Sequence, residues 1–88
     1  MLNLKRKTMT REEIKKEVIA IADRLTYRAK NDILEEHYFN QDLGFDSLDE
    51  VVFTIDAEKK FGIDIPDEAV ENVKTVKDAI DVLEKLLK

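Results

Sequence analysis

Apolar residues recur every three or four positions in three stretches of this chain, and each stretch begins at residues that can cap a helix. Ahead of the first stretch, Thr10 and Glu13 have the spacing of a capping box, in which a hydroxyl and an acid each bind a free backbone N–H. This pattern predicts a helix over 11–26. Thr75 and Asp78 repeat the spacing before the most regular amphipathic stretch, where they predict the last helix.

The middle stretch begins at Ser47, which is predicted to cap a second helix with Glu50 as the acid of its capping box. This helix is predicted to end at about Phe61, because Gly62 can adopt the left-handed conformation that ends many helices. At 100° per residue, its apolar positions fall into two stripes on roughly opposite sides. The first stripe consists of Phe53, Ala57 and Phe61, and the second of Leu48, Val51, Val52 and Ile55. A small domain has room to bury one stripe, so the second is predicted to be a partly exposed docking surface; a tight bundle that buries both is the alternative.

Two connections complete the predicted fold. About twenty residues separate the first two helices, a length typical of functional loops or of loops pinned by their own side chains. The apolar residues expected to pin this loop are Ile33, Leu34, Tyr38, Phe39, Leu43 and Phe45. Asn31 can cap a short turn that runs to Glu36, and residues 67–72 can form one or two helical turns after Pro66. We predict an all-α fold, a small four-helix bundle with three longer helices, one short third helix and a long loop between the first and second helices.

The length of 88 residues allows a single domain, which we place at residues 10–88, after a flexible basic tail at residues 1–9. The chain has no cysteine, which excludes disulfides and thiolate chemistry of its own. No apolar run approaches the roughly 20 residues that cross a bilayer, and no signal-peptide pattern is present. We therefore expect a cytoplasmic protein without a membrane span.

Charge is unevenly distributed along the sequence. Residues 1–30 carry a net charge of +5, residues 31–71 a net charge of −11 and residues 72–88 a net charge of +1. The acidic middle repels phosphate backbones and attracts basic protein surfaces. We therefore expect partners with basic patches and no binding of nucleic acid through this region.

Ser47 is the residue around which the candidate chemistry gathers. Its simplest role is that of a helix cap. Nucleophilic catalysis is poorly supported, because the sequence places no histidine or lysine to take its proton, and His37, the only histidine, has no catalytic group near it. The nearby acids do not have the spacing of a calcium loop, so no metal site is predicted. An exposed serine at a helix start also suits modification by another enzyme with a phosphate-containing group, because the helix N–H groups and dipole stabilise an anion.

Three sequence blocks resemble one protein family in their order and spacing. Residues 42–49, which contain Asp46-Ser47-Leu48, resemble the attachment motif of acyl carrier proteins. Residues 61–68 resemble the segment that follows the second helix in these proteins, and residues 75–80 resemble the start of their last helix. The resemblance is close over residues 39–87 and loose over residues 10–38.

The resemblance implies a carrier protein and not an enzyme. Ser47, flanked by Asp46 and Leu48, would carry a 4′-phosphopantetheine arm that a phosphopantetheinyl transferase installs from coenzyme A, and the thiol of that arm would hold acyl chains as thioesters. The chain, as a monomer, would shuttle these intermediates between fatty-acid biosynthesis enzymes that have basic docking patches. The residues implied for partner recognition are Asp46, Leu48, Asp49, Glu50, Val51, Ile55 and Asp56. Those implied for the lining of an acyl cavity are Phe53, Ala57 and Phe61.

Three positions depart from the family pattern and leave alternatives open. Val52 stands where fatty-acid carriers often have glutamate, and Lys59 and Lys60 stand in a run that is usually acidic. A specialised carrier for a polyketide, a lipid-A-type acyl chain or an amino acid is therefore one alternative. A non-carrier acidic helical interaction domain, in which Ser47 is only a helix cap, is the other.

Overall fold

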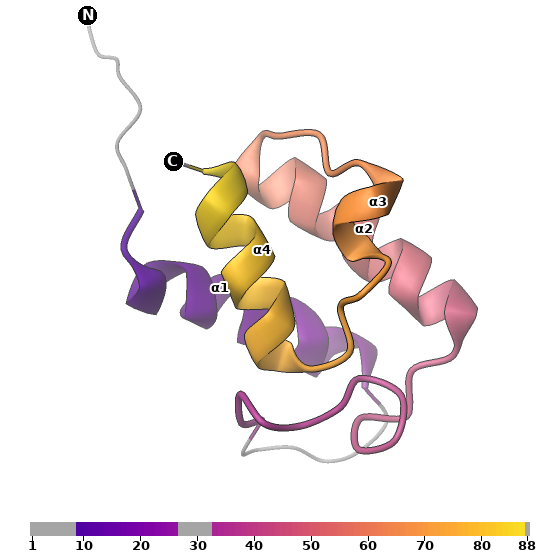
Figure 1. Cartoon of the computed structure of the whole chain (residues 1–88). Helices are drawn as coiled ribbons and strands as arrows, with labels where there is room; N and C mark the ends of the chain where they lie inside the picture. The colour runs from indigo at the N-terminus through magenta and orange to yellow at the C-terminus, as the bar shows by residue number, and fades with distance from the viewer. Residues whose placement is uncertain (1–8, 27–32, 88) are drawn as a thin grey trace, which may run out of the picture.

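The computed structural model describes residues 9–26 and 33–87 of the chain. Its helices are α1 (Arg11–Leu25), α2 (Ser47–Phe61), α3 (Asp67–Val70) and α4 (Val76–Leu86). The helices α1, α2 and α4 are long and α3 is short, and a long connection joins α1 to α2 (Figure 1). The predicted all-α fold is confirmed, since the β-type pairing within the described ranges is limited to an isolated bridge between Tyr38 and Thr75.

Capping boxes begin the first and last helices where the sequence predicts them. The hydroxyl of Thr10 accepts the backbone N–H of Glu13 at 3.1 Å, and the Glu13 carboxylate accepts the N–H of Thr10 at 2.8 Å. Thr75 and Asp78 form the same reciprocal pair at the start of α4. These helix starts depend on contacts between residues three positions apart, and for that reason they can be predicted from a short stretch of sequence.

Two of the remaining helix ends are close to prediction and one is not. α2 ends at Phe61, because Gly62 adopts the left-handed conformation with a φ of 67°. α1 ends one residue before the predicted position. The helix predicted over 67–72 ends at Val70, and none of its residues is buried. A helix this short has little packing to extend it, which accounts for the difference.

The hydrophobic core is organised around α1. This helix packs against both α4 and α2, while α3 packs against α4 (Figure 1). Figure 1 shows α4 crossing in front of α1. The helical residues buried in this core are Ile14, Val18, Ile21, Ala22, Phe53, Ala57, Val76, Ala79, Ile80 and Leu83.

The connection between α1 and α2 is held by its own apolar residues and by α4. Four of the six predicted pins are buried, namely Ile33, Phe39, Leu43 and Phe45. The prediction was wrong for Leu34 and Tyr38, whose side chains are 46% and 43% exposed. Tyr38 forms an isolated β-bridge with Thr75 and keeps its side chain at the surface, whereas Phe39 begins the following turn and is buried. Leu34 lies in a surface turn, in which its carbonyl accepts the N–H of His37 at 3.1 Å.

Backbone hydrogen bonds fix this connection against the start of α4. The N–H of Phe39 donates to the Lys74 carbonyl at 3.0 Å, and the N–H of Val76 donates to the His37 carbonyl at 3.0 Å. The loop therefore satisfies N–H groups of the first turn of α4 and, in return, is held in place ahead of Ser47. His37 is a partly buried loop residue, whose Nδ1 accepts the N–H of Leu34 at 3.0 Å.

Two further predictions fall largely outside the described residues. The cap predicted at Asn31 lies there, and the described end of that turn, Glu35 and Glu36, is not helical. Of the predicted tail over 1–9, the structure describes Met9, which is half-buried against the core. No helix in the described part of the chain is long and apolar enough to cross a membrane.

Candidate functional site

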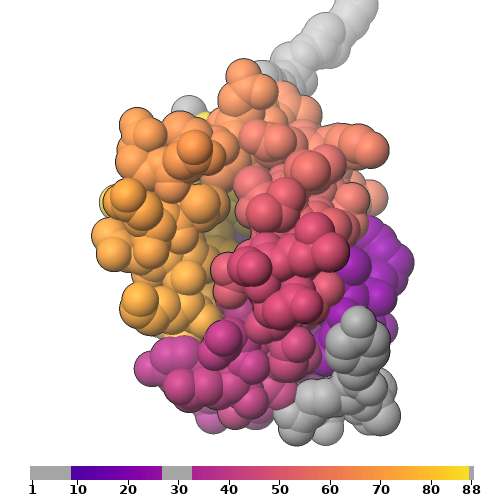
Figure 2. Space-filling model, turned by 90° about the vertical axis from the view of Figure 1, so that its right-hand side faces the viewer, coloured from indigo at the N-terminus to yellow at the C-terminus, as the bar shows by residue number. Residues whose placement is uncertain are grey.

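A cavity of about 470 Å³ separates α2 from α3 and α4. Figure 2 shows it as a hollow between α2 and the segment that contains α3, with α4 at its floor. Most of its lining is apolar and comes from the loop before α2 and from all the helices except α1. The polar residues that line it are Ser47, Glu50, Thr54, Glu58 and Asp67.

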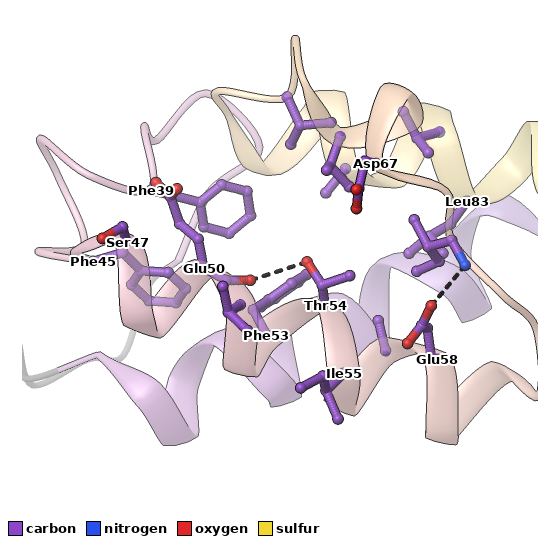
Figure 3. Close-up of a pocket in the computed structure, with 17 residues that line it drawn as sticks. Phe39, Phe45, Ser47, Glu50, Phe53, Thr54, Ile55, Glu58, Asp67 and Leu83 are labelled. Carbon is purple, nitrogen blue, oxygen red and sulfur yellow. Dashed lines mark hydrogen bonds between the residues drawn. The ribbon is translucent and has the colours of Figure 1, made fainter.

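Ser47 lies at one end of this cavity, where a cluster of three phenylalanine rings begins (Figure 3). The ring of Phe39 lies 5.3 Å from that of Phe45 and 5.1 Å from that of Phe53, measured between ring centroids. Figure 3 shows Phe39 and Phe45 beside Ser47, Phe53 farther along α2, and Glu58 and Leu83 at the opposite end. The tilted rings are in the range at which aromatic pairs attract each other, so they form a packed wall at the Ser47 end.

Ser47 is the first residue of α2 and not its cap, which corrects the prediction. The cap is Asp46, whose Oδ1 accepts the N–H of Asp49 at 2.9 Å, while Asp49 Oδ2 accepts the N–H of Asp46 at 3.0 Å. The capping box is therefore shifted by one residue from the predicted pair of Ser47 and Glu50. Both pairs have suitable side chains at suitable spacing, and the structure uses the earlier one.

Because of this shift, the Ser47 hydroxyl takes no part in the capping box. Within the described ranges it makes no hydrogen bond, and the residue is exposed. The Asp49 backbone N–H, together with further N–H groups at the helix start, lowers the pKa of the Asp46 carboxyl below its ordinary value of 3.8. The Asp46 carboxylate accepts the N–H of Asp49 and makes no hydrogen bond with the Ser47 hydroxyl in the described residues.

The two stripes of α2 face opposite environments, as predicted. Phe53 and Ala57 are buried and line the cavity, whereas Leu48, Val51 and Ile55 are 68%, 54% and 45% exposed. Val51 and Ile55 also line the cavity mouth, which joins the exposed stripe to the cavity.

Two positions of these stripes differ from the expected pattern. Val52, placed in the exposed stripe, is half-buried. Phe61, expected to line the cavity, does not line it and packs half-buried against the core. Phe61 is at the end of α2, where the chain turns away at Gly62, and this position takes its ring past the end of the cavity.

The acidic residues predicted for partner recognition differ in whether their carboxylates already make hydrogen bonds or ion pairs within the protein. Asp46 and Asp49 are bound in the capping box, and Asp56 is half-buried 3.5 Å from the guanidinium of Arg24. The Glu50 carboxylate makes no hydrogen bond or ion pair within the described part of the chain, and this residue is exposed. Of the four, Glu50 is the carboxylate with its full hydrogen-bonding capacity available to a partner.

One of the unexpected lysines is also accounted for. The ammonium of Lys60 lies 3.4 Å from the carboxylate of Glu17 on α1. This pair and that of Arg24 with Asp56 join α1 and α2 along one edge. The basic residue in a usually acidic run therefore has a contact within the fold.

Several lining residues were not identified as site residues from the sequence. Phe39 and Phe45 were predicted only as loop pins, and Thr54 and Glu58 were not singled out. The signal for the phenylalanines was present, because a long pinned loop directly before Ser47 brings its buried rings near that residue. Glu58 had no such signal, because its partner, Ile65, follows the helix end.

The arrangement suits a covalently attached phosphate ester with an apolar cargo. An exposed, unbonded hydroxyl at the start of a helix of 15 residues is accessible to a modifying enzyme, and the helix dipole favours an anion there. The adjacent cavity is mostly apolar and large enough for a flexible hydrocarbon chain. The described residues contain no group of three or more potential metal ligands. The residues present thus fit a phosphate-linked prosthetic group on Ser47.

Comparison with known proteins agrees with this chemistry. A family model described as phosphopantetheine attachment site matches residues 16–83. An acyl carrier protein of Porphyromonas gingivalis is 44% identical over 77 residues, which cover 86% of this chain and 97% of the relative. An acyl carrier protein of Chloroherpeton thalassium is 42% identical, with coverage of 85% and 94%.

The similarity extends to three-dimensional structure. A solved structure of a proposed acyl carrier protein from Mycobacterium tuberculosis matches with a TM-score of 0.76 and 27% identity, over 83% of this chain and 97% of the other. The family model covers more than half of the chain, and two relatives exceed 40% identity over most of their length. The chain therefore belongs to the acyl carrier proteins, which hold a covalent 4′-phosphopantetheine group and are carriers, not enzymes.

Proposed function

We propose that Ser47 is the residue that carries 4′-phosphopantetheine, and that the chain shuttles acyl thioesters between enzymes of fatty-acid biosynthesis. The observation that supports this most directly is the free, exposed hydroxyl of Ser47 at the mouth of an apolar cavity. When bound, the group supplies a thiol to which acyl chains are joined as thioesters. The chain itself has no cysteine, so this thiol would be the working sulfur.

The residues around Ser47 have distinct tasks in this proposal. Asp46 caps α2 and keeps the start of the helix formed while Leu48 stays exposed beside it. Phe53 and Ala57 provide buried walls for an acyl chain, which gains free energy when it leaves water. The protein residues thus position the attachment point and shelter the cargo.

Partner enzymes would dock on the exposed side of α2. Leu48, Val51 and Ile55 form its apolar centre. The acidic rim consists of Asp46, Asp49, Glu50 and Asp56. Basic patches on a transferase or a synthase enzyme would be steered toward this rim, and such exposed pairs speed encounter more than they strengthen binding. That balance suits a carrier that must be released. We further infer that it acts as a cytoplasmic monomer, in keeping with its small size and net charge of −5.

The two alternatives fare differently. The hypothesis of a non-carrier acidic interaction domain, in which Ser47 is only a helix cap, is wrong, since Asp46 is the cap and the chain belongs to the acyl carrier proteins. A specialised carrier remains the second candidate, because Val52, Lys59 and Lys60 make the docking helix less acidic than is usual in fatty-acid carriers. Measuring which acyl groups are accepted from purified synthase systems distinguishes the two candidates.

Intact mass, before and after incubation with coenzyme A and a broad-specificity phosphopantetheinyl transferase, tests the attachment site. We expect one added arm, assigned to Ser47 by peptide mapping, and none on the Ser47→Ala variant. An arm on another residue, or no addition to folded protein, would contradict the proposal. Circular dichroism of both proteins provides the control, because Ser47→Ala removes no hydrogen bond within the described structure and should fold normally.

A further inference from the structure

At the end of the cavity farthest from Ser47, one side-chain hydrogen bond joins α2 to the segment before α3. Oε2 of Glu58, on α2, accepts the backbone N–H of Ile65 at 2.8 Å, and the bond is partly buried. Both residues line the cavity, and Ile65 is only 9% exposed. Figure 3 shows this bond at the opposite end of the cavity from Ser47.

The backbone of α2 does not approach the backbones of the helices across the cavity. In the described part of the chain, no Cα atom of α2 lies within 8 Å of a Cα atom of α3 or α4. The N–H groups of Gly62 and Ile63 bind the backbone carbonyl of Glu58, at 2.8 and 3.2 Å, and these bonds only turn the chain out of the helix. The Glu58 side chain is therefore the polar contact that ties Ile65, and with it the segment leading to α3, back to α2.

The chemistry of the bond makes it a strong positional constraint. A poorly hydrated backbone N–H needs a hydrogen-bond acceptor, and removal of the acceptor leaves the N–H unsatisfied at a cost in free energy. A carboxylate acceptor gives a shorter and stronger bond than a neutral one. Glu58 thus holds the Ile65 side chain in one place, as an apolar stop at the end of the cavity.

We propose that Glu58 is a positioning residue that, by holding Ile65, sets the length of acyl chain the cavity shelters. This inference rests on the proposed function of Ser47. A short acyl chain that enters from the Ser47 end stays near the Phe39, Phe45 and Phe53 wall and does not reach Ile65. A longer chain fills the cavity and contacts Ile65, so its protection from water depends on the bond made by Glu58.

The test is the rate at which hydroxylamine cleaves the thioester of the loaded protein, measured for acyl groups from butyryl to palmitoyl. In the wild type we expect cleavage to slow as the chain lengthens toward Ile65. In Glu58→Ala we expect cleavage of the long chains to be about three- to ten-fold faster, as for loss of one hydrogen bond, and cleavage of butyryl to be unchanged. Glu58→Gln keeps a neutral acceptor oxygen, so its profile should lie between those of Glu58→Ala and the wild type.

Two further variants make the result specific. Glu68→Ala removes the same charge from an exposed position of α3 that does not line the cavity, so its profile should match the wild type. Ile65→Ala shortens the stop without altering Glu58 and should reproduce the selective loss for long chains. It also provides the test if Glu58→Ala does not fold, as judged by circular dichroism.

Three results would overturn the inference. Equal profiles for the wild type and Glu58→Ala would show that the bond does not control the cavity end. An equal acceleration at every chain length would indicate general loosening instead of a length limit. Failure of the transferase to load Ser47 would overturn the proposed function and this inference with it, whereas normal loading with an unchanged profile would overturn the inference alone.

Discussion

The side of the molecule where α1 meets α4 and the side where α2 faces α3 and α4 are built on opposite plans. Between α1 and α4, side chains fill the space: Ile14, Val18, Val76 and Ile80 are each fully buried. Between α2 and the other two helices lies the cavity, and no Cα atoms of the described helices come within 8 Å of each other across it. The side between α1 and α4 is a packed core, and the side between α2 and the other two helices encloses the cavity.

Ion pairs reinforce the same division. On the packed side, the guanidinium of Arg11 binds Asp81 at 2.8 Å, Glu84 at 3.0 Å and Glu35 at 3.1 Å, and Lys15 also lies 3.3 Å from Glu35. This network joins α1, the loop and α4. Within the described ranges, no ion pair joins α2 to α3 or α4 across the cavity. Ion pairs and packing contacts thus both join α1 to α4 and to α2.

The difference shows how a chain of 88 residues can be both folded and open. A domain this small has little stability to lose, so a cavity in its centre would be costly. Here the cavity lies to one side of α1, and the fully buried residues Ile14, Val18, Val76 and Ile80 do not line it. Three predictions test this division.

Matched valine truncations should give the largest contrast. Val18→Ala empties a fully buried position on α1 and should lower the free energy of unfolding by about 2 kcal/mol. Val73 is half-buried and lines the cavity, so Val73→Ala should cost about 1 kcal/mol or less. Urea unfolding of the two variants measures both values. Equal losses would mean that the cavity side contributes as much to stability as the packed side.

The Arg11 network should make stability depend on acid. Partial burial of Glu35 raises the pKa of its carboxyl, but hydrogen bonds from Lys15 and Arg11 outweigh burial and lower this pKa below its ordinary value of 4.5. Burial also raises the pKa of the Asp81 carboxyl, but hydrogen bonds from Arg11 and Lys77 outweigh it and lower this pKa below its ordinary value of 3.8. A carboxyl with a lowered folded-state pKa stabilises the fold at pH values above its unfolded pKa, and this contribution disappears as the pH falls through the folded pKa. Stability should therefore decrease as the pH falls below about 4.5.

Thermal unfolding at neutral and acid pH separates this network from other carboxyls. Arg11→Ala should lower the melting temperature at pH 7 and make its fall in acid shallower, because Glu35 and Asp81 lose a cationic partner. Lys16→Ala, an exposed residue of α1, is the control and should retain the wild-type slope. An Arg11→Ala profile parallel to the wild type would show that the network does not contribute to the acid sensitivity.

The smallest contrast concerns the start of α2. Asp46→Ala removes the cap and should lower the melting temperature more than Ser47→Ala does, because Ser47 makes no bond in the described structure. We expect Ser47→Ala to stay within about 0.5 kcal/mol of the wild type. Thermal unfolding of both variants measures this difference. A larger fall in melting temperature for Ser47→Ala than for Asp46→Ala would indicate that Ser47 caps the helix and would contradict its assignment as a free attachment point.

Predictions from the sequence were most successful where the deciding contacts are local. The boxes at Thr10 and Thr75, the stop at Gly62 and the division of α2 into a buried and an exposed stripe were all confirmed. At Ser47 the local pattern is ambiguous, because Asp46 with Asp49 and Ser47 with Glu50 have equal spacing. The preceding residue, Phe45, is 3% exposed and its N–H binds the Phe39 carbonyl at 2.9 Å. Burial of that ring fixes where the chain enters the helix, and this places the aspartate at the cap.

By itself, then, the sequence determined the number and order of the helices and the acidic character of the middle region, because these depend on neighbours along the chain. The tertiary structure alone decided the cavity and its ends. Its walls come from segments as distant as Phe39 and Leu83, and a cavity is the volume that their combined shapes leave unfilled. The Arg11–Asp81 pair spans 70 positions, and the Glu58–Ile65 bond crosses a helix end. No local periodicity specifies such contacts, because they form only when the packed elements bring their partners together.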